Sequence, residues 1–227
     1  MSIILHIETA TKNCSVALSE SGKMIALKEH YAQNFSHSEQ LHGFIQDVMG
    51  EAQMSMSSID AVAVSKGPGS FTGLRIGVAA AKGICFALDL PLIGVNSLQI
   101  LAEKYNETIE ALLFPMFDAR RMEVYVMVLN EKGEVVKPTF TEIISLDSFN
   151  ELSKEVPWVF IGEGAEKCKA LLDAPHIKYH SEIQYPSASE MVALAWHAFQ
   201  FKDFEDVAYF EPFYLKDFYT TAKKIVE

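Results

Sequence analysis

The sequence has few cysteines, and they form no pattern that would hold a disulfide framework or a metal. Cys14, Cys85 and Cys168 are far apart and include no C-x-x-C pair, so neither a disulfide-rich scaffold nor a zinc knuckle is expected. No apolar run approaches the roughly 20 residues that span a bilayer. Residues 1–8 lack the basic start and long apolar centre of a signal peptide. These absences are typical of a soluble protein of a reducing cytosol.

Positive charge is also scarce. The chain carries 30 acidic residues against 19 lysines and arginines, which gives a net charge of -11. Proteins hold nucleic-acid backbones with concentrated lysine and arginine, so this chain is not expected to hold a nucleic acid unaided. What the sequence does have is apolar residues: 49% of 227 residues are hydrophobic, enough for the core of one large domain or two small ones.

The first half of the chain alternates strand and helix patterns. Apolar spacing and turn residues predict a β-meander and two further strands, at residues 2–7, 14–19, 24–29, 59–64 and 91–95. Ser36 and Glu39 form the capping-box pattern that begins a helix over 36–50, and a second helix is predicted over 72–88. The order βββαβαβ is typical of a mixed sheet covered by helices.

The second half repeats this pattern more loosely. Strands are predicted at residues 112–117, 124–129 and 158–161, and a helix at 189–201. We therefore expect an α/β protein of two lobes, the first over 1–103 and a smaller one over 104–227. The C-terminal segment of the second lobe could return to the first.

A glycine-rich turn leads into the helix predicted over 72–88. Such a turn exposes backbone N–H groups at a positive helix end, where an anion can bind. It is not a Walker A loop, since Leu74 follows Gly73 where that motif requires lysine. A tight connection without a ligand is the simpler interpretation, and both stay open. The residues that would lie near an anion are Gly67, Gly69, Ser70, Thr72, Gly73 and Arg75.

The same helix has two apolar faces, which indicates that it is covered on two sides. Leu74, Val78, Ala81, Cys85 and Leu88 form the face that suits a sheet, and a second face carries smaller residues. The second neighbour could be the helix over 36–50 of this chain or a helix of another protein. The predicted partner surface consists of Leu41, Phe44, Ile45, Val48, Ile76, Ala80, Gly83 and Ala87.

No constellation of side chains predicts catalysis or metal binding. His176 and His180 have the spacing of a helical ligand pair, but their context predicts a loop and strand without further ligands. No nucleophile elbow is present. Residues 118–125 crowd opposite charges, which is more typical of a surface ion-pair cluster than of a catalytic site.

Five segments together resemble one family. Residues 7–11, 14–18, 66–77 and 118–125, and the stretch Pro212-Phe213-Tyr214-Leu215-Lys216, are similar to motifs of the TsaB (YeaZ) family, although that family usually has arginine at position 216. The resemblance implies an actin-like fold of the ASKHA or ribonuclease H-like type. It also implies membership of the bacterial complex that makes N6-threonylcarbamoyladenosine in tRNA. In that complex the TsaD (Kae1-type) subunit transfers the group, TsaE is an ATPase, and TsaB is a scaffold.

The resemblance also implies where the chemistry lies. TsaD carries two metal-binding histidines after a Val-Asn dipeptide, and here Ser97 and Leu101 stand in those places. ATP and a divalent metal are therefore expected on the partner subunits, and tRNA is expected to be met through the complex. Two alternatives remain: an enzyme, either a small ASKHA phosphotransferase with Glu8 as a Mg²⁺ ligand or a glycoprotease-like protein, and a homodimer through the same apolar face.

Overall fold

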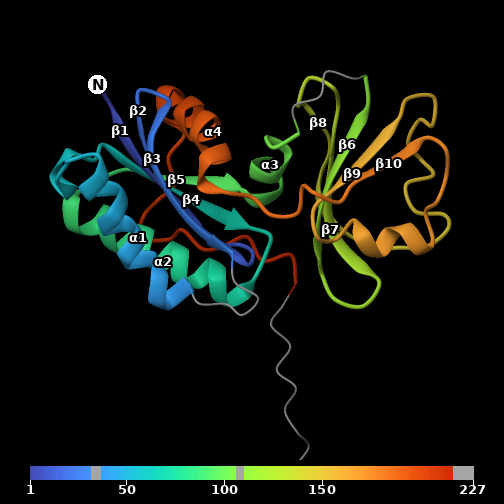
Figure 1. The fold of residues 1–227 in the computed structure, drawn as a ribbon, viewed down its shortest axis with the longest axis horizontal. Coiled ribbons are helices and arrows are strands. Elements are labelled where there is room, and N and C mark those ends of the chain that lie inside the picture. Colours follow the sequence, from blue (N-terminus) through green and yellow to red (C-terminus); the bar gives the residue numbers. More distant parts are fainter. Residues whose placement is uncertain (32–36, 106–109, 217–227) are drawn as a thin grey trace, which may run out of the picture.

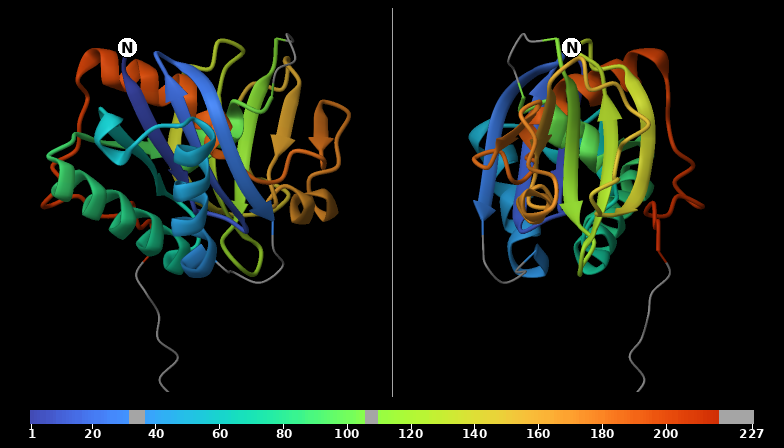
Figure 2. Two further views of the ribbon diagram at one scale, coloured as in Figure 1. Left: turned by 60° about the vertical axis from the view of Figure 1, so that its left-hand side comes forward. Right: turned by 90° about the vertical axis from the view of Figure 1, so that its right-hand side faces the viewer.

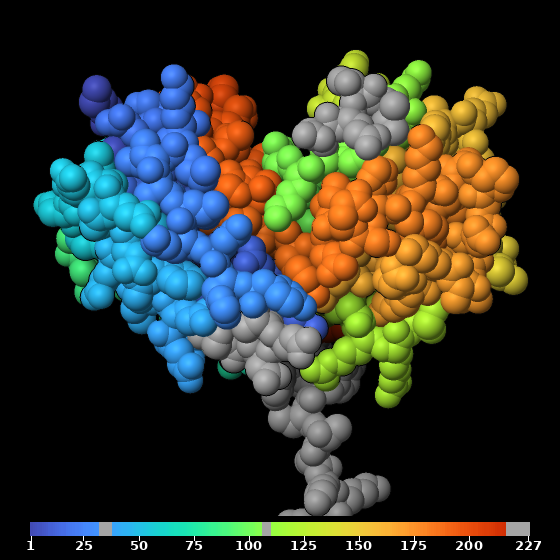
Figure 3. All heavy atoms as spheres, in the orientation of Figure 1, coloured from blue at the N-terminus to red at the C-terminus, as the bar shows by residue number. Residues whose placement is uncertain are grey.

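The computed structural model describes residues 1–31, 37–105 and 110–216. Each of its two lobes is built around a five-stranded sheet (Figure 1). A notch separates the lobes along part of their junction (Figure 3). The sequence-based prediction of a two-lobed α/β protein is confirmed.

The first sheet has the strand order β3-β2-β1-β4-β5. Its strands are β1 (Ile3–Glu8), β2 (Asn13–Glu20), β3 (Lys23–Tyr31), β4 (Ala61–Gly67) and β5 (Leu92–Asn96). The first three strands form an antiparallel meander, and β4 and β5 run parallel to β1. All five were predicted, with their ends shifted by one to three residues.

Alternation along β1 gives the sheet two buried faces. The helices α1 (His37–Glu51) and α2 (Phe71–Leu88) lie on one side of the sheet and α4 (Ala188–Phe201) on the other (Figure 2). Ile3, Leu5 and Ile7 belong to the core under α1 and α2, whereas Ile4 belongs to the core under α4. Both predicted helices of the first half therefore cover one face. The Ser36 cap predicted for the first of them lies outside the described residues.

The placement of α4 corrects the predicted lobes. The sequence assigned this helix to the second lobe, but Met191 and Ala195 pack against β1, β4 and β5 of the first sheet. Its start is fixed by a capping box between Ser187 and Glu190. The prediction was wrong because an apolar helix face does not reveal which sheet covers it.

The second sheet repeats the connectivity of the first. Its order is β10-β9-β6-β7-β8, with an antiparallel meander β6–β7–β8 followed by β9 and β10 parallel to β6. The strands are β6 (Leu112–Asp118), β7 (Glu123–Leu129), β8 (Val135–Ile143), β9 (Trp158–Ile161) and β10 (Ile177–His180), with a 3-10 turn η2 (Glu166–Ala170) after β9. Two lobes of this one topology make an actin-like fold.

The lobes are joined by α3 (Ser97–Ala102) and by the C-terminal segment. After α4 the chain returns along the first lobe, where Glu205 N donates to Leu92 O (2.8 Å) and Phe213 N donates to Lys66 O (2.6 Å). Lys216 then forms an ion pair with Glu123 of β7 in the second lobe. The C-terminal segment thus ends as a bridge between the lobes.

In length and composition α2 would also pass as a membrane span, with a mean hydropathy of 1.4 over 18 residues. Its Leu74, Val78, Ala81 and Cys85 are buried against the first sheet. This is the pattern of a core helix with one open face.

Candidate functional site

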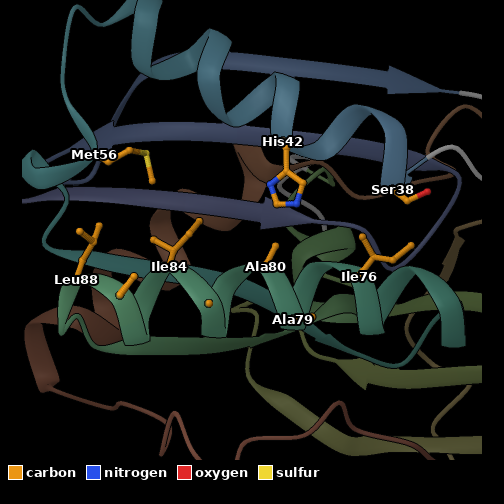
Figure 4. A pocket seen from close by; sticks show the side chains of 10 residues that line it. Ser38, His42, Met56, Ile76, Ala79, Ala80, Ile84 and Leu88 are labelled. Carbon is orange, nitrogen blue, oxygen red and sulfur yellow. The ribbon is translucent and has the colours of Figure 1, made fainter.

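A groove of about 660 Å³ runs between α1 and α2. His42 points from α1 toward α2, and Ile76, Ala80 and Ile84 point from α2 toward α1 (Figure 4). Ser38, His42, Met56, Ile76, Ala79, Ala80, Gly83, Ile84, Ala87 and Leu88 line it. The groove is therefore mainly apolar, with small side chains along α2.

The small-residue face of α2 is open. Ala79, Gly83 and Ala87 are exposed, and a Cβ placed on Gly83 would meet no atom within 4 Å. Phe86, at the position next to Ala87 in the same helix, is 86% exposed. All four α2 residues of the predicted partner surface line the groove, whereas the identity of the partner stays a prediction.

The α1 half of the predicted surface needs correction. Leu41, Ile45 and Val48 are buried in the core beneath α1, and Phe44 is half-buried against the same core. These residues hold α1 on the sheet, so they offer a partner little surface. Ser38 and His42 line the groove instead.

Four other lining residues were also missed. Leu88 was assigned to the face of the helix that suits a sheet, but it lines the groove. Ala79 and Ile84 were overlooked although each lies three or four residues from one that was named, so helical spacing could have found them. Met56 lies beyond α1 in a short 3-10 turn, η1 (Met56–Ser58), and no sequence signal places it in the groove.

Close packing accounts for the glycines of the turn before α2. Ser70 caps the helix by accepting from Gly73 N (3.3 Å), and Ser70 N donates to Ala10 O (2.7 Å). A Cβ on Gly69 would collide with Ala10 O, and one on Gly77 would collide with Thr9 Oγ1. The turn at Gly69 and the helix at Gly77 thus need glycine to lie against the β1–β2 connection, and anion binding stays a prediction.

The exposed residues of this turn face the C-terminal segment. Arg75 lies 3.9 Å from the ring centroid of Phe71 and donates from Nε to Tyr214 Oη (3.3 Å), and Thr72 is exposed beside them. A Cβ on Gly67 would lie 2.8 Å from Phe213 O. The segment therefore covers one side of the turn.

The two positions compared with metal-binding histidines have structural roles. Ser97 Oγ accepts from Gly67 N (3.1 Å), and Leu101 is buried in the core between α3 and the second sheet. Among the residues that the structure describes, no group of three or more histidine, cysteine, aspartate or glutamate side chains could hold a metal. His176 packs edge-on to Trp158, whereas His180 contacts Glu182 (2.8 Å).

Glu8 is fully buried at the end of β1. Its Oε1 accepts from Ala10 N (2.6 Å), and its Oε2 has no hydrogen-bond partner. Burial raises the pKa of Glu8 to about 8, although the Ala10 N–H and the Ser65 hydroxyl act to lower it. At neutral pH this group is mainly an uncharged acid, which makes it a weak cation ligand as it stands.

The charged cluster at residues 118–125 forms ion pairs, as the surface interpretation predicts. However, Asp118 pairs with Lys167 and Glu123 with Lys216, not with the neighbouring Arg120 and Arg121.

Comparisons with known proteins agree with this architecture. Residues 32–224 match the family model described as TsaD, tRNA N6-adenosine threonylcarbamoyltransferase. The chain is 31% identical to the tRNA threonylcarbamoyladenosine biosynthesis protein TsaB of Escherichia coli, over 94% of each chain. It is 30% identical to TsaB of Haemophilus influenzae, over 97% of this chain and 96% of that one.

A solved structure gives the same result. YeaZ from Pseudomonas aeruginosa superposes with a TM-score of 0.82 at 28% identity, covering 95% of this chain and all of that one. The duplicated sheets, the groove and the match to TsaD define a two-lobed actin-like protein related to that transferase. Within this group, the chain belongs to the TsaB (YeaZ) family.

Proposed function

We propose that this chain takes part in the biosynthesis of threonylcarbamoyladenosine in tRNA as a non-catalytic scaffold. In this role it pairs with and activates a TsaD-type subunit and helps to recruit a TsaE-type ATPase. The observation that supports the pairing is the open groove between α1 and α2. The names of the related proteins support the pathway.

The shape of the groove suits helices. Side chains of a partner helix can enter the space between α1 and α2, and the small Ala80, Gly83 and Ala87 let its backbone approach closely. Because the match to the TsaD model extends over most of this chain, we expect a TsaD-type subunit to have helices equivalent to α1 and α2. The two pairs would then pack as a four-helix arrangement.

The absence of catalysis is proposed on the structural roles of Ser97 and Leu101 and on the buried, mainly neutral Glu8. ATP and the divalent metal would then act on the partner subunits. Calorimetric titration of the purified chain with Mg²⁺ and ATP should give no stoichiometric heat. Tight binding with turnover would instead identify an enzyme.

Gly83→Leu tests the groove directly. The leucine has room because no atom lies within 4 Å of its Cβ, and removing a helical glycine should stabilise the helix by about 0.5–1 kcal/mol. The side chain would, however, fill the space that a partner helix needs. We expect a folded protein that no longer retains a TsaD-type subunit in a pull-down.

Gly50→Leu is the matched control. Gly50 is an exposed glycine of α1 with equal free space, and it does not line the groove. This variant should retain the partner. If the Gly83→Leu variant retains the TsaD-type subunit as well as the Gly50→Leu variant does, partner pairing does not use the groove.

The same face could pair with itself when no partner is present, because small-residue helix faces associate readily and most oligomers are symmetric dimers. Light scattering of the chain alone should then give a dimer that dissociates when the TsaD-type subunit is added. A dimer that persists beside the bound partner would place self-association on another surface.

A further inference from the structure

The turn between β6 and β7 holds two arginines in an unusual backbone conformation. Arg120 has φ +70° and Arg121 has φ +51°, in the left-handed region that residues with side chains seldom adopt. The turn is closed by bonds from Ala119 N to Glu123 O (3.0 Å) and from Arg120 N to Asp118 Oδ1 (2.7 Å). Strain of this kind is concentrated at functional sites.

The carboxylates beside these arginines are already engaged. Lys167 of η2 pairs with Asp118 and also donates to the carbonyl oxygen of Arg121 (2.9 Å). Lys216 pairs with Glu123. Within residues 1–31, 37–105 and 110–216, no ion pair includes an arginine. Arg120 and Arg121 are both exposed. The two lysines thus hold the turn through its carboxylates and leave the guanidinium groups of Arg120 and Arg121 available to bind a ligand.

The chain has only three arginines, and the third, Arg75, lies in the first turns of α2. Arg75 donates to Tyr214, two residues before the Lys216 that pairs with Glu123. The β6–β7 turn, the start of α2 and the end of the C-terminal segment lie at the same end of the molecule (Figure 1). A chain of net charge -11 therefore carries all three of its arginines on segments at one end of the molecule.

Aromatic rings accompany this charge. The rings of Phe71 and Tyr214 lie 4.9 Å apart, and Arg75 lies over the Phe71 ring. Arginine binds phosphate through two parallel hydrogen bonds, and aromatic rings beside it give nucleotide bases a surface to stack on. A carboxylate of a protein partner would make no use of these rings.

We infer that Arg75, Arg120 and Arg121 form a docking site for the phosphate groups of RNA. The inference rests on the proposed function, in which the assembled complex holds tRNA. The acidic remainder of the chain repels the same phosphates, so the site would orient RNA bound mainly by the partner rather than hold it alone.

The test uses the chain assembled with the TsaD-type subunit of its own organism. Light scattering first measures assembly, and the complex is then titrated with unmodified tRNA transcript over a series of salt concentrations. In the variant Arg120→Gly/Arg121→Gly, glycine accepts the positive φ of both positions, so the turn keeps its shape. The affinity for RNA should fall at least tenfold, and the slope of log K against log salt should decrease by about 1.4–1.8 for two lost phosphate contacts.

The control is Lys132→Ala/Lys154→Ala, which removes the same charge. Both lysines are exposed, and Lys132 lies in the β7–β8 connection, at the opposite end of the second sheet. This variant should keep the wild-type salt slope. If the control lowers the slope as much as the arginine variant does, RNA responds to net charge alone and the assigned site is wrong.

Three further outcomes would overturn the inference that RNA phosphates bind these arginines. An arginine variant that assembles and binds RNA with wild-type affinity and slope overturns the inference alone. A folded arginine variant that fails to assemble would show that the arginines contact an acidic protein surface, which also overturns it. Failure of the wild-type chain to assemble would overturn the proposed function, and this inference with it.

Discussion

Glu8→Gln should stabilise the protein at neutral pH, because the native carboxyl is held uncharged in the core. Its pKa is about 8 in the folded chain, raised by burial from the usual 4.5. Between these values the unfolded chain has released the proton and the folded chain retains it. The free energy of unfolding therefore falls by up to about 1.4 kcal/mol per pH unit as the pH rises through this window.

The expected difference between the two proteins follows from this slope. The glutamine side chain of the variant has no proton to lose, and its amide oxygen can still accept from Ala10 N, as Oε1 of Glu8 does. The variant should gain under about 1 kcal/mol at pH 5, about 3 kcal/mol at pH 7 and somewhat more at pH 8. Above pH 8 the gain should level off, since both folded and unfolded wild-type chains are then ionised.

Urea denaturation of both proteins from pH 5 to pH 8 measures this gain. His6 does not disturb the comparison: burial lowers its pKa to about 3, and its effect on stability below about pH 6.5 is common to both proteins. The exposed Glu155 provides a control variant, Glu155→Gln, which should change little. Wild-type and Glu8→Gln stabilities that run parallel across the whole range would refute the assignment of Glu8 as a buried neutral acid.

Two further predictions concern backbone positions. Gly77→Ala should destabilise the protein by about 1–3 kcal/mol, because the new methyl group would displace Thr9, whose hydroxyl donates to Gly73 O (2.8 Å); an unchanged urea midpoint would show that the loop does not depend on this contact. Arg120→Gly and Arg121→Gly should each raise stability by about 1 kcal/mol, since glycine removes the left-handed strain. A loss of thermal stability would instead mean that the arginine side chains hold the turn together.

The spacing of apolar residues was sufficient to predict the strands with strong alternation and the helices with a clear apolar stripe. It was insufficient to predict β8, an edge strand that carries Lys137 and Pro138 and is only partly buried. It also missed α3, which is six residues long and is capped by Asn96, whose Oδ1 accepts from Leu98 N (2.9 Å). Short or exposed elements carry too little apolar signal to be distinguished from loops.

For the candidate site, the two faces of α2 could be predicted because its period is continuous over 18 residues. The face of α1 that lines the groove could not be predicted, because apolar residues at helical spacing lie on the buried side of any amphipathic helix. Leu41 and Val48 therefore belong to the core. The sequence also could not show that Arg120 and Arg121 form no ion pair among the described residues, since the neighbouring Asp118 and Glu123 pair with Lys167 and Lys216 from distant segments.

A thiol footprint tests the central claim, that a TsaD-type subunit covers the groove between α1 and α2. The native Cys14, Cys85 and Cys168 are buried, so Ala87→Cys would supply the reactive thiol in the groove and Lys132→Cys a matched thiol in the second lobe. Addition of the subunit should slow maleimide labelling at position 87 and leave labelling at position 132 unchanged. Equal labelling rates at position 87 with and without the bound subunit would contradict the account.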